Sequence, residues 1–252
     1  MSLELAKEIQ QKHLFAFSFN NIAVLLGKKI STNIEDIIEK IVHKNLGGYC
    51  FEHNKLLFEA LKSLGFDVSI SIAKVINKKN INTPKTHRIT ILQFQGERYL
   101  IDAGFGAYTP MTVLKLDVTK NIQKDFHLIQ KNDITYVLKF RTHNDFFVLY
   151  EFDLLKYTEE DCNQANLYSY TNPNAFFLNN LIISKKFDNQ TFSYRNNCYH
   201  QISKNTVKEY TKIIDIKDYI TLKNIIKTDF NIDLSSNEAN ILFQKAEQFK
   251  RK

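Results

Sequence analysis

The spacing of apolar residues changes twice along this chain of 252 residues, and this change constrains its fold more than any other feature. From residue 3 to about residue 42 apolar side chains recur at helical spacing, which predicts two or three short helices. Ser31 or Thr32 is expected to cap the helix that follows them. The best defined helix opens after Gly47-Gly48 and stops at Gly65.

After Gly65 the spacing becomes that of β-strands. Short runs rich in Ile, Val, Phe, Tyr and Thr predict strands over residues 68–75, 87–94, 98–102, 135–140 and 146–152. Several short strands at this interval favour an antiparallel barrel or sheet. From Lys208 onward the apolar spacing indicates helices again. We find no internal repeat, low-complexity linker or strong domain boundary, so the chain is predicted to be one α+β fold.

The composition argues against several classes of protein. With 44% hydrophobic residues the chain can bury a sizeable core, and no stretch approaches the roughly 18 uninterrupted apolar residues of a membrane-spanning helix. The net charge of +7 is spread along the chain, which argues against nucleic acid as a partner but suits a phosphorylated small molecule. The N-terminus is charged and has no apolar signal-peptide core, which predicts a cytoplasmic location.

The three cysteines, Cys50, Cys162 and Cys198, form neither a CxxC pair nor an even disulfide set. This pattern favours a reducing compartment and disfavours a structural zinc site. Cys50 stands apart because it follows Gly47-Gly48 at the first turn of a predicted helix, where free N–H groups favour a thiolate and lower the thiol pKa. Cys50 is therefore a candidate nucleophile, with a gap-filling buried cysteine as the alternative. Cys162 and Cys198 are interpreted as structural or exposed.

A thiolate used in acyl transfer needs an imidazole partner, which in turn needs a group that fixes its tautomer. His87 and Asp102 are candidates because they lie on consecutive predicted strands. A two-residue turn Gln95-Gly96 places Asp102 opposite Ile89, one diagonal step from His87, whereas a turn over residues 93–96 places it directly opposite His87. Both registers put the two side chains on one face. Taken alone, each has a structural alternative, and the other histidines are interpreted as structural or exposed.

Several segments resemble the arylamine N-acetyltransferase family. Residues 46–54, LGGYCFEHN, resemble its RGGxCxELN signature, Thr86-His87 resembles the segment with its catalytic histidine, and residues 101–106, IDAGFG, resemble its D-V/A-GFG motif. Residues 12–22 are similar to its AHL…PFENL stretch and residues 171–181 to its THPxSxFxxNL stretch. The likeness therefore extends over most of the chain.

The resemblance implies a fold and a division of the chain. It implies an N-terminal helical bundle over residues 1–80, a central antiparallel β-barrel over residues 81–190 and a C-terminal α/β lid over residues 191–252. The first two parts would form a cysteine-protease-like core. The bundle would carry Cys50, and the barrel His87 and Asp102.

The resemblance also implies an activity. Acetyl-CoA would acetylate Cys50, and the acetyl group would then pass to an arylamine or arylhydrazine in a ping-pong reaction that requires no metal. His87 would be the ion-pair and base partner of Cys50, and Asp102 would orient His87. Thr86, Phe105 and Gly106 match motif positions near the acceptor and CoA cleft and are expected to bind substrate.

The chain departs from the family pattern in four places. Leu46 replaces the arginine of RGG, His53 the leucine of ELN and Asn20 the glutamate of PFEN, and the chain begins about where the second helix of the family would. These changes are expected to affect stability and acceptor range more than chemistry. Two other functions stay open from the residues: a thiol hydrolase or transglutaminase-like enzyme with the same triad, and an inactive homologue that binds an aromatic ligand or partner protein.

Overall fold

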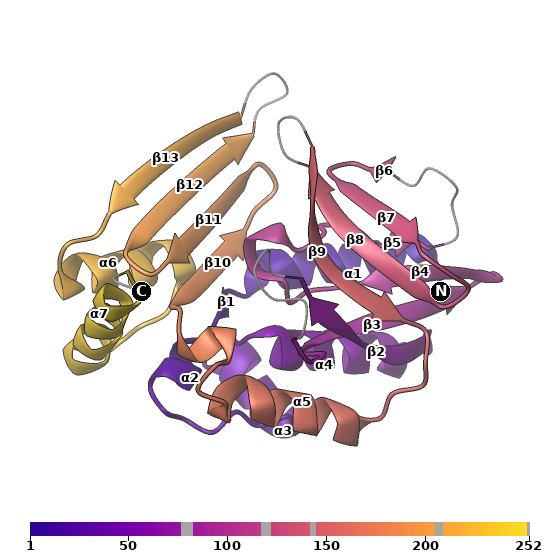
Figure 1. Cartoon of the computed structure of the whole chain (residues 1–252), viewed down its shortest axis with the longest axis horizontal. Helices are drawn as coiled ribbons and strands as arrows, with labels where there is room; N and C mark the ends of the chain where they lie inside the picture. The colour runs from indigo at the N-terminus through magenta and orange to yellow at the C-terminus, as the bar shows by residue number, and fades with distance from the viewer. Residues whose placement is uncertain (77–82, 117–121, 142–144, 205–208, 251–252) are drawn as a thin grey trace.

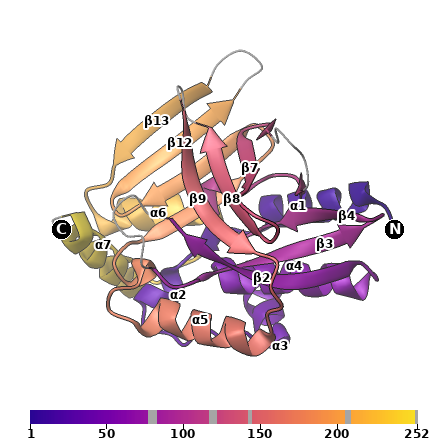
Figure 2. The same ribbon diagram turned by 45° about the vertical axis from the view of Figure 1, so that its right-hand side comes forward.

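A computed structural model describes residues 1–76, 83–116, 122–141, 145–204 and 209–250. Helices α2, α3, α4 and α5 form a layer from which two β-sheets rise side by side (Figure 1). In the turned view α4 lies along the base of β2 and β3 (Figure 2). The predicted α+β class, with a barrel-like antiparallel sheet between helical parts, is confirmed.

The N-terminal helices agree with the predicted spacing. They are α1 (Leu3–Ala16), α2 (Ile22–Leu25), α3 (Ile34–Ile37), which continues as a π-helix over Ile38–His43, and α4 (Cys50–Ser63). The predicted cap at Ser31 or Thr32 is wrong. Asn33 is the N-cap of α3, because its Oδ1 accepts from the backbone N–H of Glu35 at 3.1 Å. Ser31 instead accepts from the backbone N–H of Asn33.

An eight-stranded antiparallel sheet curls into a nearly closed barrel. Its strands are β2 (Asp67–Val75), β3 (His87–Phe94), β4 (Glu97–Ile101), β5 (Leu114–Lys115), β6 (Ile122–Gln123), β7 (Phe126–Gln130), β8 (Thr135–Arg141) and β9 (Phe146–Asp153). Their order is β5-β4-β3-β2-β9-β8-β7-β6. The five strands expected from the sequence are all present, with ends shifted by at most one residue. Alternate residues such as Ile89, Leu128 and Tyr136 form the barrel core.

A second sheet, in the order β1-β10-β11-β12-β13, stands beside the barrel. It comprises β1 (Phe19–Asn20), β10 (Ile182–Lys186), β11 (Gln190–Arg195), β12 (Cys198–Lys204) and β13 (Glu209–Asp215). Helices α6 (Tyr219–Phe230) and α7 (Ser236–Lys250) pack on one face, and α5 (Glu159–Thr171) and two short 3₁₀ turns, Gly106–Tyr108 and Phe176–Leu178, complete the described elements.

The helix expected from Lys208 onward is wrong for residues 209–215, which form β13 and pair with β12 along their length. Ile214 lies opposite Tyr199, and both pack with the core of α6 and α7, whereas Ile213 on the other face is 61% exposed. This in-and-out alternation is the two-residue period of a strand. Adjacent isoleucines suit either period, so pairing with β12 decides the outcome.

In the part of the chain that the structure describes, no helix is long and apolar enough to cross a membrane.

Candidate active site

Cys50 is the first residue of α4, and the preceding loop is held from both sides. The Glu52 side chain accepts from the backbone N–H of Tyr49 at 3.1 Å, and Lys40 Nζ donates to Glu52 at 2.6 Å. Gly47 has φ +62°, and a side chain there would collide with the carbonyl oxygen of Ser18. The glycine pair therefore lets the loop pass close to the chain that leads into β1.

His87 and Asp102 form a buried hydrogen-bonded pair. His87 Nε2 lies 2.8 Å from Asp102 Oδ2, with the two side chains 2% and 0% exposed. Phe94 pairs with Glu97 across the two-residue turn Gln95-Gly96, so the first of the two predicted registers is the observed one. In this register Asp102 lies diagonally across from His87, as the alternation of side chains requires.

In all four hydrogen bonds described at the Asp102 carboxylate, a carboxylate oxygen is the acceptor. Oδ2 accepts from His87 and from the Tyr150 hydroxyl at 3.0 Å, while Oδ1 accepts from Asn54 Nδ2 at 3.0 Å and from the Gly104 N–H at 2.8 Å. Burial alone would raise the pKa of Asp102, but the charge and hydrogen bond of His87 and the bonds from Asn54 and Gly104 hold this pKa below its usual value. Asp102 is therefore poised as a carboxylate.

The start of α4 packs directly on the turn that carries Asp102. A Cβ added to Gly104 would lie 2.7 Å from the Cα of Cys50, so only glycine allows this approach. The Cys50 thiol lies 3.7 Å from the carbonyl oxygen of Thr86, the residue before His87. Asn54, one helical turn after Cys50, also donates to the Arg88 carbonyl at 2.5 Å. The structure thus brings the three predicted catalytic residues into one buried region.

The expected lowering of the Cys50 pKa is wrong for this arrangement. Cys50 is 2% exposed, and burial raises the pKa of its thiol well above the usual value. The charge of Asp102 raises this pKa further, while the backbone N–H groups of Phe51 and Arg88 lower it by less. Desolvation outweighs the helix N-terminus because a thiolate loses its hydration when it is buried. Cys50 therefore rests as a thiol that needs a base to ionise.

The three residues expected to bind substrate lie around this region. Thr86 is half-buried beside the thiol. The Phe105 ring centroid lies 4.9 Å from that of His87 and 5.0 Å from that of Tyr150, in edge contacts. Gly106 has φ +68°, and its added Cβ would lie 3.4 Å from Ser184 Oγ of β10, where the barrel meets the second sheet.

Sequence reasoning assigned no role to two residues that contact Asp102. Asn54 carried a usable signal, since it lies four residues after Cys50 and therefore on the same side of α4. Tyr150 carried none, because it sits in a run of apolar and aromatic residues that reads as an ordinary strand. Tyr150 reaches Asp102 because β9 pairs with β2, the strand beside β3, in the curled sheet.

Among the described residues, the side chains of the other cysteines and histidines make no described hydrogen bond to Cys50, His87 or Asp102. All three cysteines are free thiols, with Cys162 buried and Cys198 half-buried. His13 and His53 form a buried pair, 2.8 Å between His13 Nε2 and His53 Nδ1. Within the described ranges no three His, Cys, Asp or Glu side chains are arranged to hold a metal ion.

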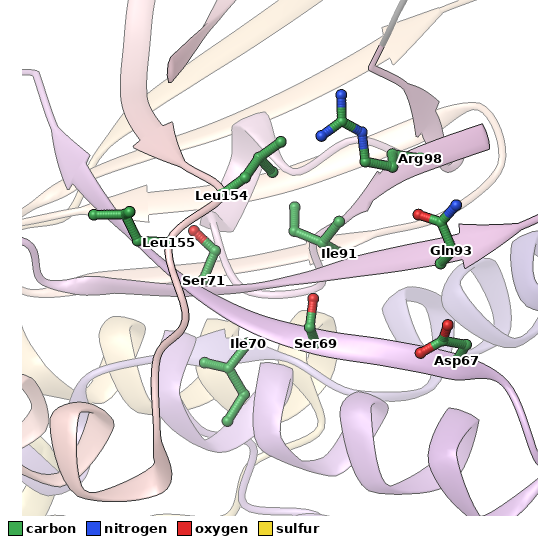
Figure 3. Close-up of a pocket in the computed structure, with 9 residues that line it drawn as sticks. All are labelled: Asp67, Ser69, Ile70, Ser71, Ile91, Gln93, Arg98, Leu154 and Leu155. Atoms are coloured by element: carbon green, nitrogen blue, oxygen red, sulfur yellow. The ribbon is translucent and has the colours of Figure 1, made fainter. Parts of the chain in front are cut away.

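A separate pocket of about 180 Å³ lies between β2, β3, β4 and the chain after β9 (Figure 3). Ser69 and Ser71 point into it from β2, whereas Ile70 points to the other side of the strand (Figure 3). Asp67, Gln93 and Arg98 make its wall polar. None of the predicted catalytic residues lines this pocket.

Comparison with known proteins identifies the class. The profile of a family described as N-acetyltransferase matches residues 2–239. The arylamine N-acetyltransferase of Salmonella typhimurium has the same fold, with a TM-score of 0.88 at 24% identity over 96% of this chain and 92% of that one. The chain is thus an acyltransferase.

Curated relatives identify the family. The pineal gland isozyme of arylamine N-acetyltransferase from Gallus gallus is 31% identical over 260 residues, which cover 92% of this chain and 88% of that protein. The arylamine N-acetyltransferase of Escherichia coli (strain K12) is 28% identical over 189 residues, covering 73% and 67%. This chain belongs to the arylamine N-acetyltransferase family. A structure of the Mycobacterium marinum enzyme in complex with CoA shares the fold, with a TM-score of 0.88 at 23% identity over 97% and 93% of the two chains.

Proposed function

We propose that this arylamine N-acetyltransferase uses acetyl-CoA as its donor and works by a ping-pong reaction through acetyl-Cys50. The observation that carries the proposal is the buried His87–Asp102 hydrogen bond, 2.8 Å long, in a turn packed against the helix start that holds Cys50. The M. marinum relative, which shares the fold, is known in complex with CoA, and this supports the choice of donor.

In the first half-reaction Cys50 Sγ attacks the carbonyl carbon of the acetyl thioester. A new sulfur–carbon bond forms, and the bond to the CoA sulfur breaks. Asp102 occupies His87 Nε2, so Nδ1 is the ring nitrogen that accepts the Cys50 proton and returns it to the departing CoA thiolate. Proton transfer to His87 explains how a thiol whose pKa burial has raised can act as a nucleophile.

In the second half-reaction the acceptor amine attacks the acetyl carbon, and the bond to Cys50 breaks. His87 takes the amine proton and passes it to the Cys50 thiolate, which restores the resting thiol. Backbone N–H groups at the start of α4 stabilise the oxyanion in both steps. Besides the two substrates, each half-reaction uses only side chains and backbone N–H groups of this protein, and no metal ion takes part.

The expected substrate contacts follow from position. Phe105, half-buried against His87, offers an aromatic face to an arylamine ring. Thr86 borders the Cys50 thiol, and Gly106 borders the second sheet. An acetyl thioester would enter between them. A small recess lies between the loop that carries Gly106 and strand β10. Lys185 of β10 lines this recess and adds positive charge suited to a phosphate-bearing donor. The three free thiols support a cytoplasmic location.

Intact-protein mass spectrometry tests the proposal. The protein is mixed with acetyl-CoA and then with an arylamine such as 4-aminobenzoate. We expect one acetyl group on Cys50, found by peptide mapping, that remains until the amine is added and then appears on the amine. Cys50→Ala should acquire none, whereas Cys198→Ala, a matched control at the half-buried cysteine, should behave as wild type.

Two other results would redirect the assignment. Loss of the acetyl group to water as fast as to amine would indicate a thiol hydrolase. An acetylated amine product from Cys50→Ala at the wild-type rate would refute the covalent route.

A further inference from the structure

Gln10 is a buried polar residue that the proposed chemistry does not use. It lies on the core face of α1, four residues from both Ala6 and Leu14, and is 0% exposed. Its side-chain nitrogen Nε2 donates to the carbonyl oxygen of Asp102 at 2.8 Å and to that of Pro110 at 2.9 Å. Both hydrogens of the amide are therefore engaged by backbone carbonyls about 100 residues away, in one loop.

These two carbonyls are the two ends of the loop over residues 102–110. Inside the loop, Gly104 N–H donates to Asp102 Oδ1 at 2.8 Å, and Phe105 N–H donates to Thr109 Oγ1 at 2.8 Å. These internal bonds shape each half of the loop. Gln10 is the side chain that ties its first residue to its last.

The loop holds two groups against His87. The Asp102 carboxylate meets His87 Nε2, and the Phe105 ring meets the imidazole edge-on. A shift of the backbone at residue 102 changes the 2.8 Å contact directly, since only one Cβ separates the backbone from the carboxyl group. Misplacement of a catalytic group by about 1 Å can cost about 100-fold in rate.

The oxygen of the Gln10 amide, in contrast to its nitrogen, makes no described hydrogen bond. Gln10 Oε1 is buried and has no hydrogen-bond partner among the described residues. An unpaired buried amide oxygen costs stability, which offsets part of what the two donated bonds contribute. The two donated bonds therefore hold the loop in place even though the oxygen of the same amide stays unpaired.

We propose that Gln10 is a positioning residue for the His87–Asp102 pair. By holding the carbonyls of Asp102 and Pro110, it fixes the loop so that the carboxylate and Phe105 stay in place against the imidazole. Gln10 touches neither substrate nor Cys50. The inference rests on the proposed role of His87 as the base for Cys50.

Gln10→Met tests this role, because methionine has a similar length and no donor. We expect kcat for arylamine acetylation to fall about 10- to 100-fold, with the KM for acetyl-CoA near the wild-type value. We also expect the pH midpoint for alkylation of Cys50 by iodoacetamide to move upward, since a less well held imidazole accepts the thiol proton less readily. The thermal midpoint should fall, because the buried carbonyl oxygens of Asp102 and Pro110 lose their donor and removal of the unpaired Oε1 offsets only part of that loss.

Two further variants serve as controls. Gln11→Met makes the same change at the next residue of α1, which is only half-buried, and should keep wild-type kcat and alkylation midpoint. Gln10→Glu keeps the shape, but its neutral carboxyl can donate only one hydrogen bond, so its kcat should lie between those of wild type and Gln10→Met. If Gln10→Met does not fold, Gln10→Glu decides the question.

Wild-type kcat and alkylation midpoint in the folded Gln10 variants would overturn the inference, as would an equal loss in Gln11→Met. Failure of the wild-type protein to acetylate Cys50 would instead refute the proposed function. The alkylation midpoints would still decide the role of Gln10, since that assay needs no acetyl-CoA.

Discussion

Asp102→Asn is the sharpest test of the site, because this carboxylate is the acceptor in all four of its described hydrogen bonds. An amide replaces one acceptor oxygen by an NH₂ group. If the NH₂ takes the Oδ2 position, it faces His87 Nε2, which must then present its lone pair. The imidazole proton would move to Nδ1, the nitrogen that accepts the Cys50 proton in the proposed reaction, and that base would be lost.

The size of the effect follows from these contacts. A wrong imidazole tautomer of this kind costs about 10⁴-fold in kcat in a comparable triad. Each hydrogen bond to a charged group is worth about 1.5 to 3 kcal/mol. The bonds to His87 and Tyr150 lose their charged acceptor while less charge is buried, so the free energy of unfolding should fall by about 2 to 4 kcal/mol, which corresponds to a drop in Tm of roughly 10 °C.

The assay is steady-state acetylation of 4-aminobenzoate, together with the rate of Cys50 acetylation followed by intact mass and a thermal melt. Asp36→Asn, at an exposed carboxylate of α3, is the matched control and should change neither activity nor Tm appreciably. A folded Asp102→Asn protein with kcat within tenfold of wild type would refute the tautomer argument.

Three further predictions concern buried groups. Burial lowers the pKa of His53 from 6.5 to about 4, so between these pH values the unfolded chain binds a proton that the folded protein does not. The free energy of unfolding should therefore fall by about 3 kcal/mol as the pH drops from 6.5 to 4. Urea titrations at several pH values should show a shallower fall for His53→Leu. Burial alone would raise the pKa of Glu159, but Arg88 and then Lys55 hold it at about 2, so its contribution is present above pH 4.5 and lost toward pH 2. After discounting for screening of this 40% exposed side chain, that contribution is about 1 to 2 kcal/mol, and Glu159→Gln should lack the acid-dependent loss. In Gly104→Ala the new Cβ would lie 2.7 Å from the Cys50 Cα, so the free energy of unfolding should fall by at least about 1 to 3 kcal/mol and Cys50 acetylation should be lost. A thermal midpoint equal to that of the wild type would contradict this.

Much of the fold was predictable because its signals are local. The α4 helix and five barrel strands follow from apolar spacing between glycine stops, and the two-residue turn before β4 was one of two registers considered. The β13 error has the opposite origin. Residues 209–215 carry adjacent isoleucines that suit either period, and only pairing with β12 selects the strand. The division at residues 1–80, 81–190 and 191–252 stays a prediction.

The sequence by itself determined the chemistry that is available here: a cysteine at a helix start, a histidine and an aspartate on one face of adjacent strands, and motifs of an acyltransferase family. Tertiary structure decided how those groups behave. Burial raises the Cys50 pKa, whereas the sequence context predicted a lowered one, because desolvation depends on what packs over the thiol and not on its neighbours in the chain. Likewise, Tyr150 and Gln10 reach Asp102 only because the pairing of β9 with β2 and the packing of α1 bring distant segments together, and no local pattern encodes those contacts.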